Sequence, residues 1–185
     1  MVPLTALWLP ILLSAVFVFV ASSIIHMALG YHRSDYKQLP DEDKLLPLLR
    51  GANLQRGLYI FPFCTHKDMK SAAMQEKYRQ GPVGMLTILP SGPPAMAKFL
   101  GGWFVFCIVV SLFVAYLAGH TLPLGARHRA VLRVAGTVAF LAYALGNVVN
   151  SIWKGQQWST TVKEVFDGFV YAVLTAGTFS WLWPR

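Results

Sequence analysis

The chain has 185 residues, of which 55% are hydrophobic and only 13% are charged. Soluble domains carry about 25% charged residues, so this composition excludes an ordinary soluble domain and indicates an integral membrane protein. The formal net charge of +8 is compatible with a nucleic-acid partner. However, the basic residues flank apolar stretches and form no long run, so we attribute the charge to anionic lipid headgroups and expect no nucleic-acid partner.

Four apolar stretches are long enough to cross a hydrocarbon core of about 30 Å as helices. The first lies within residues 1–30, and the other three occupy about 99–122, 131–153 and 162–183 of a membrane domain over 99–185. The six tryptophans fall near the ends of these stretches, where amphipathic rings prefer to lie. The sequence therefore predicts an all-α integral membrane protein with four transmembrane helices.

The polar segment 31–98 is too long for a turn and predicts a small extramembrane loop domain between the first two helices. Within it, "GLYIFPF" and "GPVGMLTILP" each begin with glycine and run to a proline, which is typical of short strands. The stretches "LPDEDKLLPLLRG" and "KDMKSAAMQEKYRQ" predict helices before and between the strands. We expect an α+β cap that leans on the helix ends or on a partner, because two strands alone are marginal in water.

Basic residues indicate the orientation of the four predicted helices. The side with both termini carries 4 Lys and Arg residues and the side of the large loop carries 12, which together account for all 16 in the chain. The positive-inside rule then places the loop 31–98 in the cytoplasm and both termini outside.

The fourth predicted helix has a recognisable start. Thr161 and Glu164 fit the S/T-x-x-E capping box, so we expect Thr161 to be the N-cap. Counting from there places Asp167 about 8 Å inside the helix. A charged group at the centre of a transmembrane helix costs about 2.5–3.5 kcal/mol, and less near the interface, so Asp167 is expected to face the bundle interior and find partners.

Polar side chains recur at helical spacing in the third and fourth predicted helices, and the antiparallel path of the chain brings the end of the first helix beside them. We therefore predict one polar cluster in the leaflet nearest the large loop, in which Asp167 accepts hydrogen bonds or pairs with Lys163 or Lys154. A structural alternative stays open, because polar residues also join transmembrane helices at about 0.6 kcal/mol each. The members of the predicted cluster are His26, Asn147, Asn150, Asp167 and Tyr171.

The two cysteines lie in different settings, one in a polar loop at position 64 and one in an apolar helix at position 107, so no disulfide is expected. The second cysteine begins a series of small residues about one turn apart, which is typical of a close-packing face between transmembrane helices. The series is Cys107, Ser111, Ala115 and Gly119.

Ligands for a metal or cofactor occur at scattered positions. Cys64 and His66 form a two-ligand fragment, His26 and His32 flank a helix end, and His26 or His120 offers an axial ligand to haem or chlorophyll. The sequence has no CxxC, HxxxH or HExxH motif, and it has no GxSxG, Walker or GxGxxG motif. We therefore predict neither a metal or cofactor nor a catalytic residue.

Three segments resemble those of bacterial four-span inner-membrane proteins that have no assigned activity. They are "SSIIHMALGYHRSDYKQLP", "QGPVGMLTILPSGPP" and "IWKGQQWSTTVKEVFDGFVYAVLTAGTFSWLWP". The resemblance implies a location in the bacterial inner membrane and assigns no functional residue.

The leading functional expectation is a non-catalytic accessory subunit of a larger membrane assembly, whose partners are the lipid bilayer and other membrane subunits. Charge-poor helices, tryptophan belts and a marginal loop domain suit such a subunit. Two alternatives stay open. One is a binding or transport-like protein that holds a polar ligand or a proton at the cluster around Asp167, and the other is a small membrane enzyme that uses the same cluster for acid–base chemistry.

Overall fold

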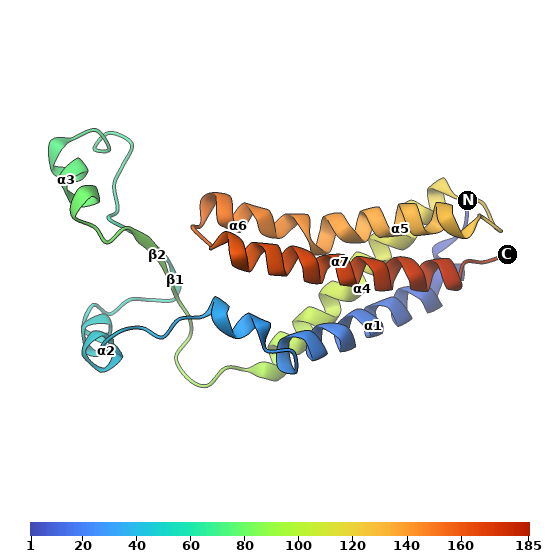
Figure 1. The fold of residues 1–185 in the computed structure, drawn as a ribbon, viewed down its shortest axis with the longest axis horizontal. Coiled ribbons are helices and arrows are strands. Elements are labelled where there is room, and N and C mark those ends of the chain that lie inside the picture. The colour runs from blue at the N-terminus through green and yellow to red at the C-terminus, as the bar shows by residue number, and fades with distance from the viewer. The chain divides into compact units, whose positions relative to one another are not determined.

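The computed structural model describes residues 1–185 and is mostly helical (Figure 1). The chain divides into two compact units. The helical unit combines Met1–Tyr36 with Ala95–Arg185, and the loop unit is Lys37–Pro94. Residues 31–36, which we expected in the loop, therefore belong to the helical unit.

The helical unit is a bundle whose long helices run side by side, with both termini at one end (Figure 1). Within it α5 packs along α7, and α1 contacts both α4 and α7. Its elements are η1 (Leu4–Leu7), α1 (Trp8–Met27), η2 (Tyr31–Asp35), α4 (Met96–Thr121), α5 (His128–Tyr143), η3 (Leu145–Asn147), α6 (Val148–Trp153) and α7 (Trp158–Trp181).

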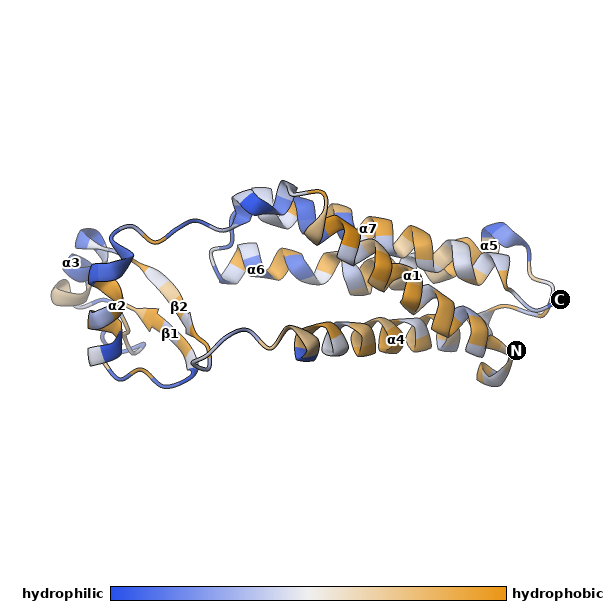
Figure 2. Cartoon of the chain, turned by 90° about the horizontal axis from the view of Figure 1, so that it is seen from below, coloured by the Kyte–Doolittle hydropathy of each residue, from blue (hydrophilic) through white to orange (hydrophobic).

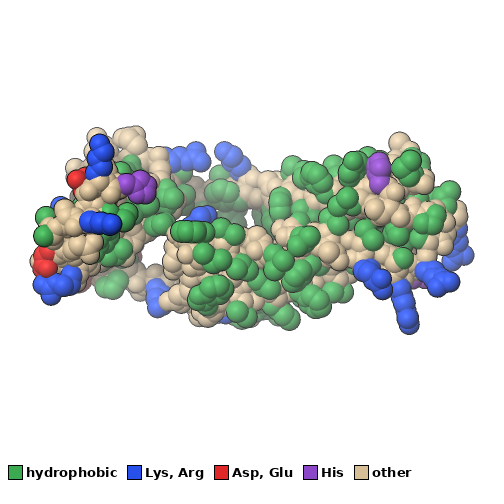
Figure 3. All heavy atoms as spheres, turned by 90° about the horizontal axis from the view of Figure 1, so that it is seen from above, with side chains coloured by type: hydrophobic (Ala, Val, Ile, Leu, Met, Phe, Trp, Pro, Cys, Tyr) green, Lys and Arg blue, Asp and Glu red, His purple; other side chains and the backbone are tan.

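Three helical segments are long and apolar enough to cross a membrane, namely Leu4–Met27, Met96–Thr121 and His128–Trp153. Hydrophobic residues run along the bundle helices, and hydrophobic side chains cover much of the bundle face seen in Figure 3 (Figures 2 and 3). These features identify a multi-pass membrane protein in contact with lipid. The helix α7 has 24 residues but is less apolar than these three segments, because polar side chains such as Asp167 and Thr175 line its buried face.

The core of the bundle consists mainly of small side chains. In α4, Cys107, Ser111, Ala115 and Gly119 are all buried, which confirms the predicted close-packing face. A Cβ atom on Gly119 would lie 2.6 Å from the carbonyl oxygen of Val2, so only glycine allows the N-terminal segment this close approach. The amide of Val2 uses that approach to donate a hydrogen bond of 2.7 Å to the carbonyl oxygen of Gly119.

The third predicted helix is not continuous, because η3 divides it into α5 and α6. The helix α7 comes very close at the end of α5. A Cβ atom on Gly168 would lie 2.6 Å from the carbonyl oxygen of Tyr143 and 2.7 Å from the amide nitrogen of Ala144. The prediction of one regular helix was therefore wrong. A single glycine such as Gly146 is tolerated inside an apolar helix, so the sequence contains no strong indication that the helix is interrupted here.

The helix α7 begins earlier than predicted. Its first residue is Trp158, and its N-cap Gln157 makes no side-chain capping bond. The capping box is therefore wrong, because Thr161 is buried inside the first turns and its hydroxyl accepts a hydrogen bond of 3.0 Å from Nε2 of Gln156. The earlier start places Asp167 about 14 Å along the helix instead of about 8 Å.

The loop unit contains a two-stranded antiparallel sheet, as predicted, with Gly57 opposite Ile88. No residue of this unit is buried, and the two strands are largely hydrophobic (Figure 2). Both cysteines of the chain are free, which confirms the absence of a disulfide. The elements of the loop unit are α2 (Glu42–Gly51), β1 (Gly57–Phe61), α3 (Ala72–Gln80) and β2 (Gly84–Ile88).

Candidate functional site

The short helix η2 brings its polar side chains against α7. Gly30 has a φ of 62°, in the left-handed region that favours glycine, and this residue reverses the chain after α1. The sequence YHRSD that follows forms one tight helical turn. Tyr31, His32 and Asp35 of this turn all contact polar groups of α7, which explains why they belong to the helical unit.

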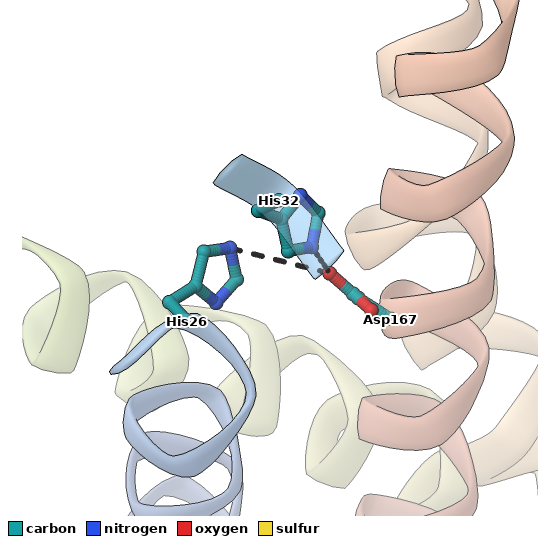
Figure 4. A group of neighbouring side chains, drawn as sticks. All are labelled: His26, His32 and Asp167. Atoms are coloured by element: carbon teal, nitrogen blue, oxygen red, sulfur yellow. Dashed lines mark hydrogen bonds and ion pairs between the residues drawn. The ribbon is translucent and has the colours of Figure 1, made fainter. Parts of the chain in front are cut away.

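Asp167 is the centre of the site, and it is only 3% exposed. The hydroxyl of Tyr31 donates a hydrogen bond to its Oδ1 atom. Nε2 of His32 lies 2.7 Å from its Oδ2 atom, and Nε2 of His26 lies 4.0 Å from the same oxygen (Figure 4). Three rings from the α1–η2 segment thus converge on one buried carboxylate of α7.

His32 bridges two carboxylates. Its Nδ1 atom lies 2.7 Å from Oδ2 of Asp35, while its Nε2 atom lies 2.7 Å from Oδ2 of Asp167. Each ring nitrogen of His32 is therefore within hydrogen-bonding distance of a carboxylate, one in its own turn and one on α7.

Lys163 fixes the other side of η2. Its Nζ atom donates hydrogen bonds to Oδ1 of Asp35 at 2.6 Å, to the hydroxyl of Ser34 at 2.7 Å and to the carbonyl oxygen of Tyr31 at 2.8 Å. The predicted pairing of this lysine with Asp167 is replaced by the pairing with Asp35. All three donor positions of the ammonium group are used within one turn of chain.

The electrostatics of η2 favour a charged Asp35 and a protonated Tyr31. Burial alone would raise the pKa of Asp35, but the hydrogen bonds from Lys163, His32 and Thr160 outweigh burial and hold that pKa below its ordinary value. Burial raises the pKa of Tyr31, and the hydrogen bond to Asp167 raises it further. The phenol therefore remains a donor to the buried carboxylate at any physiological pH.

His26 completes the group from the last turn of α1. Its ring is stacked on the ring of His32, with centroids 4.6 Å apart and an interplanar angle of 6°. Its Nδ1 atom lies 3.0 Å from the carbonyl oxygen of Ser22. The side chain of His26 is 53% exposed, in contrast to the 4% exposure of the Asp167 side chain that it faces. The cluster is therefore buried on its α7 side and accessible on its α1 side.

A cavity of about 280 Å³ opens beside these rings. It is smaller than the pockets of about 300–1,000 Å³ that bind drug-sized ligands, so it suits water or a small solute. Its lining combines η2 with the turn before α7 and includes His26, His32, Asp35, Gln156, Thr160 and Glu164.

The structure brings together only part of the predicted cluster. His26 and Asp167 meet, whereas Tyr171 lies one turn further along α7, and its buried hydroxyl has no hydrogen-bond partner. The amide of Asn147 donates to the carbonyl oxygen of Tyr143 in its own helix. Neither it nor the side chain of Asn150 bonds to Asp167, because η3 interrupts the helix that was expected to align them.

Sequence reasoning named His32 only as one of several scattered candidate ligands, and it left Tyr31 and Asp35 in the loop without a role. The available signal was local, because His32 and Asp35 stand three residues apart, directly after a glycine that follows an apolar helix. Within the helical unit, His120 is not part of this cluster. His120 is exposed, with its Nδ1 atom 2.8 Å from the carbonyl oxygen of Tyr116.

No family model, curated protein or solved structure matches the chain. The function is therefore argued from the geometry of this site.

Proposed function

We propose that the protein is a four-span membrane protein that binds a small polar ligand at the cluster of His26, His32 and Asp167. The observation that carries the proposal is a buried carboxylate on which two imidazoles converge at the wall of a cavity of about 280 Å³. A purely structural ion pair has no need of an accessible ring, whereas the side chain of His26 is 53% exposed. A binding role is therefore favoured over the structural alternative, in which the polar side chains only join α7 to the α1–η2 segment.

The helix α7 serves as the fourth span in this proposal. Its 24 residues extend about 36 Å at 1.5 Å per residue, enough for a hydrocarbon core. Most of its buried polar side chains face inward, and most of its large apolar side chains face outward, as lipid contact requires. The large apolar side chains of α7 that are more than half exposed are Trp158, Val162, Phe166, Phe169, Val173 and Trp181.

Topology is tested with the native cysteines, because Cys107 is fully buried and Cys64 lies in the loop unit. We expect a membrane-impermeant maleimide to label Cys64 in inverted inner-membrane vesicles but not in intact bacterial cells, since the proposed orientation puts the loop unit in the cytoplasm. Cys64→Ala is the labelling control. Tags at the two termini should both be accessible from the opposite side. Termini on different sides would exclude four spans.

Ligand binding is tested by thermal unfolding of the purified protein in detergent, with a panel of amines, amino acids, sugars and inorganic cations. A ligand at 100 times its Kd adds about 2.7 kcal/mol, which corresponds to a rise of roughly 5–10 °C in Tm. We expect at least one solute to raise the Tm of the wild type but not that of Asp167→Asn. The control is His128→Gln, at the other end of the bundle. A panel in which no stabilisation depends on Asp167 would contradict the proposal.

A second candidate function is the accessory subunit, which the loop unit favours. This unit has no buried residue, yet it exposes apolar side chains that a partner subunit would cover. We expect native mass spectrometry in mild detergent to show a stoichiometric partner that is lost when Leu58 and Phe63 are changed to Ser. The enzyme alternative stays a prediction. The exposed large apolar residues of the loop unit are Leu39, Leu48, Leu58, Ile60, Phe61, Phe63, Met69, Val83, Met85 and Leu89.

A further inference from the structure

The cluster presents three ligand atoms that suit a divalent transition-metal ion. Nε2 of His26, Nε2 of His32 and Oδ2 of Asp167 all lie within 4.8 Å of one another (Figure 4). Two imidazole nitrogens and one carboxylate oxygen are donors that Zn²⁺, Fe²⁺ and related ions accept. We infer that these three atoms hold one such ion, an inference that rests on the proposed binding function of the same cluster.

The opposite nitrogen of each histidine is already held, as metal-binding histidines require. Nδ1 of His26 lies 3.0 Å from the carbonyl oxygen of Ser22, which only accepts, so this nitrogen carries the hydrogen and Nε2 carries the lone pair of the neutral ring. Nδ1 of His32 lies 2.7 Å from a carboxylate oxygen of Asp35. Carbonyl and carboxylate partners of this kind orient histidine ligands and make them more basic.

The carboxylate ligand is oriented in the same way. The hydroxyl of Tyr31 donates to Oδ1 of Asp167, which leaves Oδ2 directed at the two imidazoles. All three ligand side chains thus have one atom fixed by a hydrogen bond and the other atom directed at a common point. Outer hydrogen bonds of this kind are found around the ligands of metal sites.

Only small movements separate these distances from those of a bound ion. Ligands about 2.1 Å from a tetrahedral zinc ion lie about 3.4 Å apart. Oδ2 of Asp167 is 2.7 Å from Nε2 of His32 and 4.0 Å from Nε2 of His26. The first distance has to open by about 0.7 Å and the second to close by about 0.6 Å, while the distance between the two histidine nitrogens, at most 4.8 Å, has to close by up to about 1.4 Å. The half-exposed ring of His26 is free to provide that adjustment.

The neighbouring cavity gives the ion a route and an open coordination position. Both histidines line it, and Glu164 adds a carboxylate to the lining, which favours approach of a cation. A volume of about 280 Å³ holds several waters at about 30 Å³ each. Three protein ligands with water access are typical of catalytic zinc sites, whereas structural zinc sites are closed by four protein ligands.

The test uses the full-length protein in detergent, stripped with a chelator and titrated with Zn²⁺ against a chromophoric competitor. We expect one Zn²⁺ per chain in the wild type. His32→Gln and Asp167→Asn should each lower the affinity at least 100-fold, and Tyr31→Phe should lower it about 10-fold, because the last change removes only an orienting hydrogen bond. The matched control is His128→Gln, whose Nδ1 atom also lies 2.9 Å from a carbonyl oxygen, that of Ser180. It should keep full affinity.

A second measurement needs no variant. X-ray absorption at the zinc edge should show two imidazole ligands in the wild type.

If Asp167→Asn fails to fold, His26→Gln replaces it, since this ring is half exposed and its loss disturbs little packing. Absence of Zn²⁺ binding by the wild type, or binding that all cluster variants retain, overturns the metal inference. A non-metal solute whose stabilisation depends on Asp167 would then still support the proposed function, whereas no Asp167-dependent ligand of any kind would overturn both.

Discussion

The two ends of the helical bundle are closed by different kinds of interaction. At the end that holds both termini no ion pair occurs, and main-chain oxygens accept the bonds, including the one to Nδ1 of His128. The amide of Gly125 donates to the carbonyl oxygen of Pro184 at 2.9 Å, and the indole of Trp183 donates to that of Pro123 at 3.0 Å. At the other end, where α1 leads into η2, four ionisable side chains hold η2 to α7. We call these the terminal end and the site end.

This difference separates a fixed closure from a changeable one. The bonds made by Gly125 and Trp183 involve no ionisable group, so they do not depend on protons or ions between about pH 5 and pH 8. The network at the site end is built from ionisable side chains, His32, Asp35, Lys163 and Asp167, so a bound cation acts directly on the contacts between η2 and α7. The bonds at the terminal end involve none of these residues.

Asp167→Asn should cause the largest loss of stability. The change replaces the buried carboxylate that accepts from Tyr31 and contacts His32, and breaking a buried, hydrogen-bonded network at one carboxylate costs about 3 kcal/mol or more. We expect the Tm in detergent to fall by roughly 6–12 °C. His128→Gln at the terminal end is the control and should lower it far less. Equal losses in the two variants would remove the distinction between the ends.

Gly168→Ala should be the next most damaging change. The added Cβ atom would lie 2.6 Å from the main chain of α5, which has no flexible side chain to move aside. Overpacking of this kind costs about 1–3 kcal/mol. The matched control is Gly177→Ala in the same helix, where a Cβ atom meets nothing within 4 Å, so a neutral or slightly favourable effect is expected. Thermal unfolding of both variants decides whether α7 needs this glycine for its contact with α5.

The pair of Lys163 and Asp35 should show a coupling of about 1–2 kcal/mol in a double-mutant cycle with Lys163→Met and Asp35→Asn. Both side chains are more than three-quarters buried, and their atoms are 2.6 Å apart. Because the folded state lowers the pKa of Asp35, its contribution is present at neutral pH and is lost as the pH falls below the ordinary carboxyl range. Unfolding in the presence of a chelator at pH 7 and below pH 4 measures this. A stability gap between wild type and Asp35→Asn that is unchanged below pH 4 would contradict the assigned charge.

The sequence was sufficient to predict the long apolar helices, the two-stranded sheet and the close-packing face of α4. Each depends on composition or on regular spacing, which a single chain displays directly. The start of α7 was predicted too late because Thr161 fits a capping box, whereas in the structure its hydroxyl accepts a hydrogen bond from Gln156. Local patterns of this kind cannot reveal competition from a neighbouring segment.

The sequence predicted which residues of the site meet only where their depth in the membrane was sufficient to bring them together. His26 and Asp167 were placed together because both were expected at the same depth of antiparallel helices. Asn147 and Asn150 do not bond to Asp167, because η3 interrupts the helix that was expected to align them. His32 was named only as a candidate ligand, because the reversal at Gly30 that brings η2 against α7 was not predicted. Breaks and reversals depend on tertiary contacts, so hydropathy does not report them.

Trp183→Phe at the terminal end should have the smallest effect on stability. It also gives the most direct test of whether the terminal end differs from the site end. The change removes one hydrogen bond of 3.0 Å to the carbonyl oxygen of Pro123 and costs about 1 kcal/mol, the usual net value for a neutral bond. Since no ionisable group takes part, the loss should be the same at pH 5 and pH 8, and the same with or without Zn²⁺. Asp167→Asn measured in parallel should depend on Zn²⁺, because that variant loses a ligand as well as a helix contact. If the loss in Trp183→Phe also varied with Zn²⁺, the ion would act on the whole bundle and not on the site end alone.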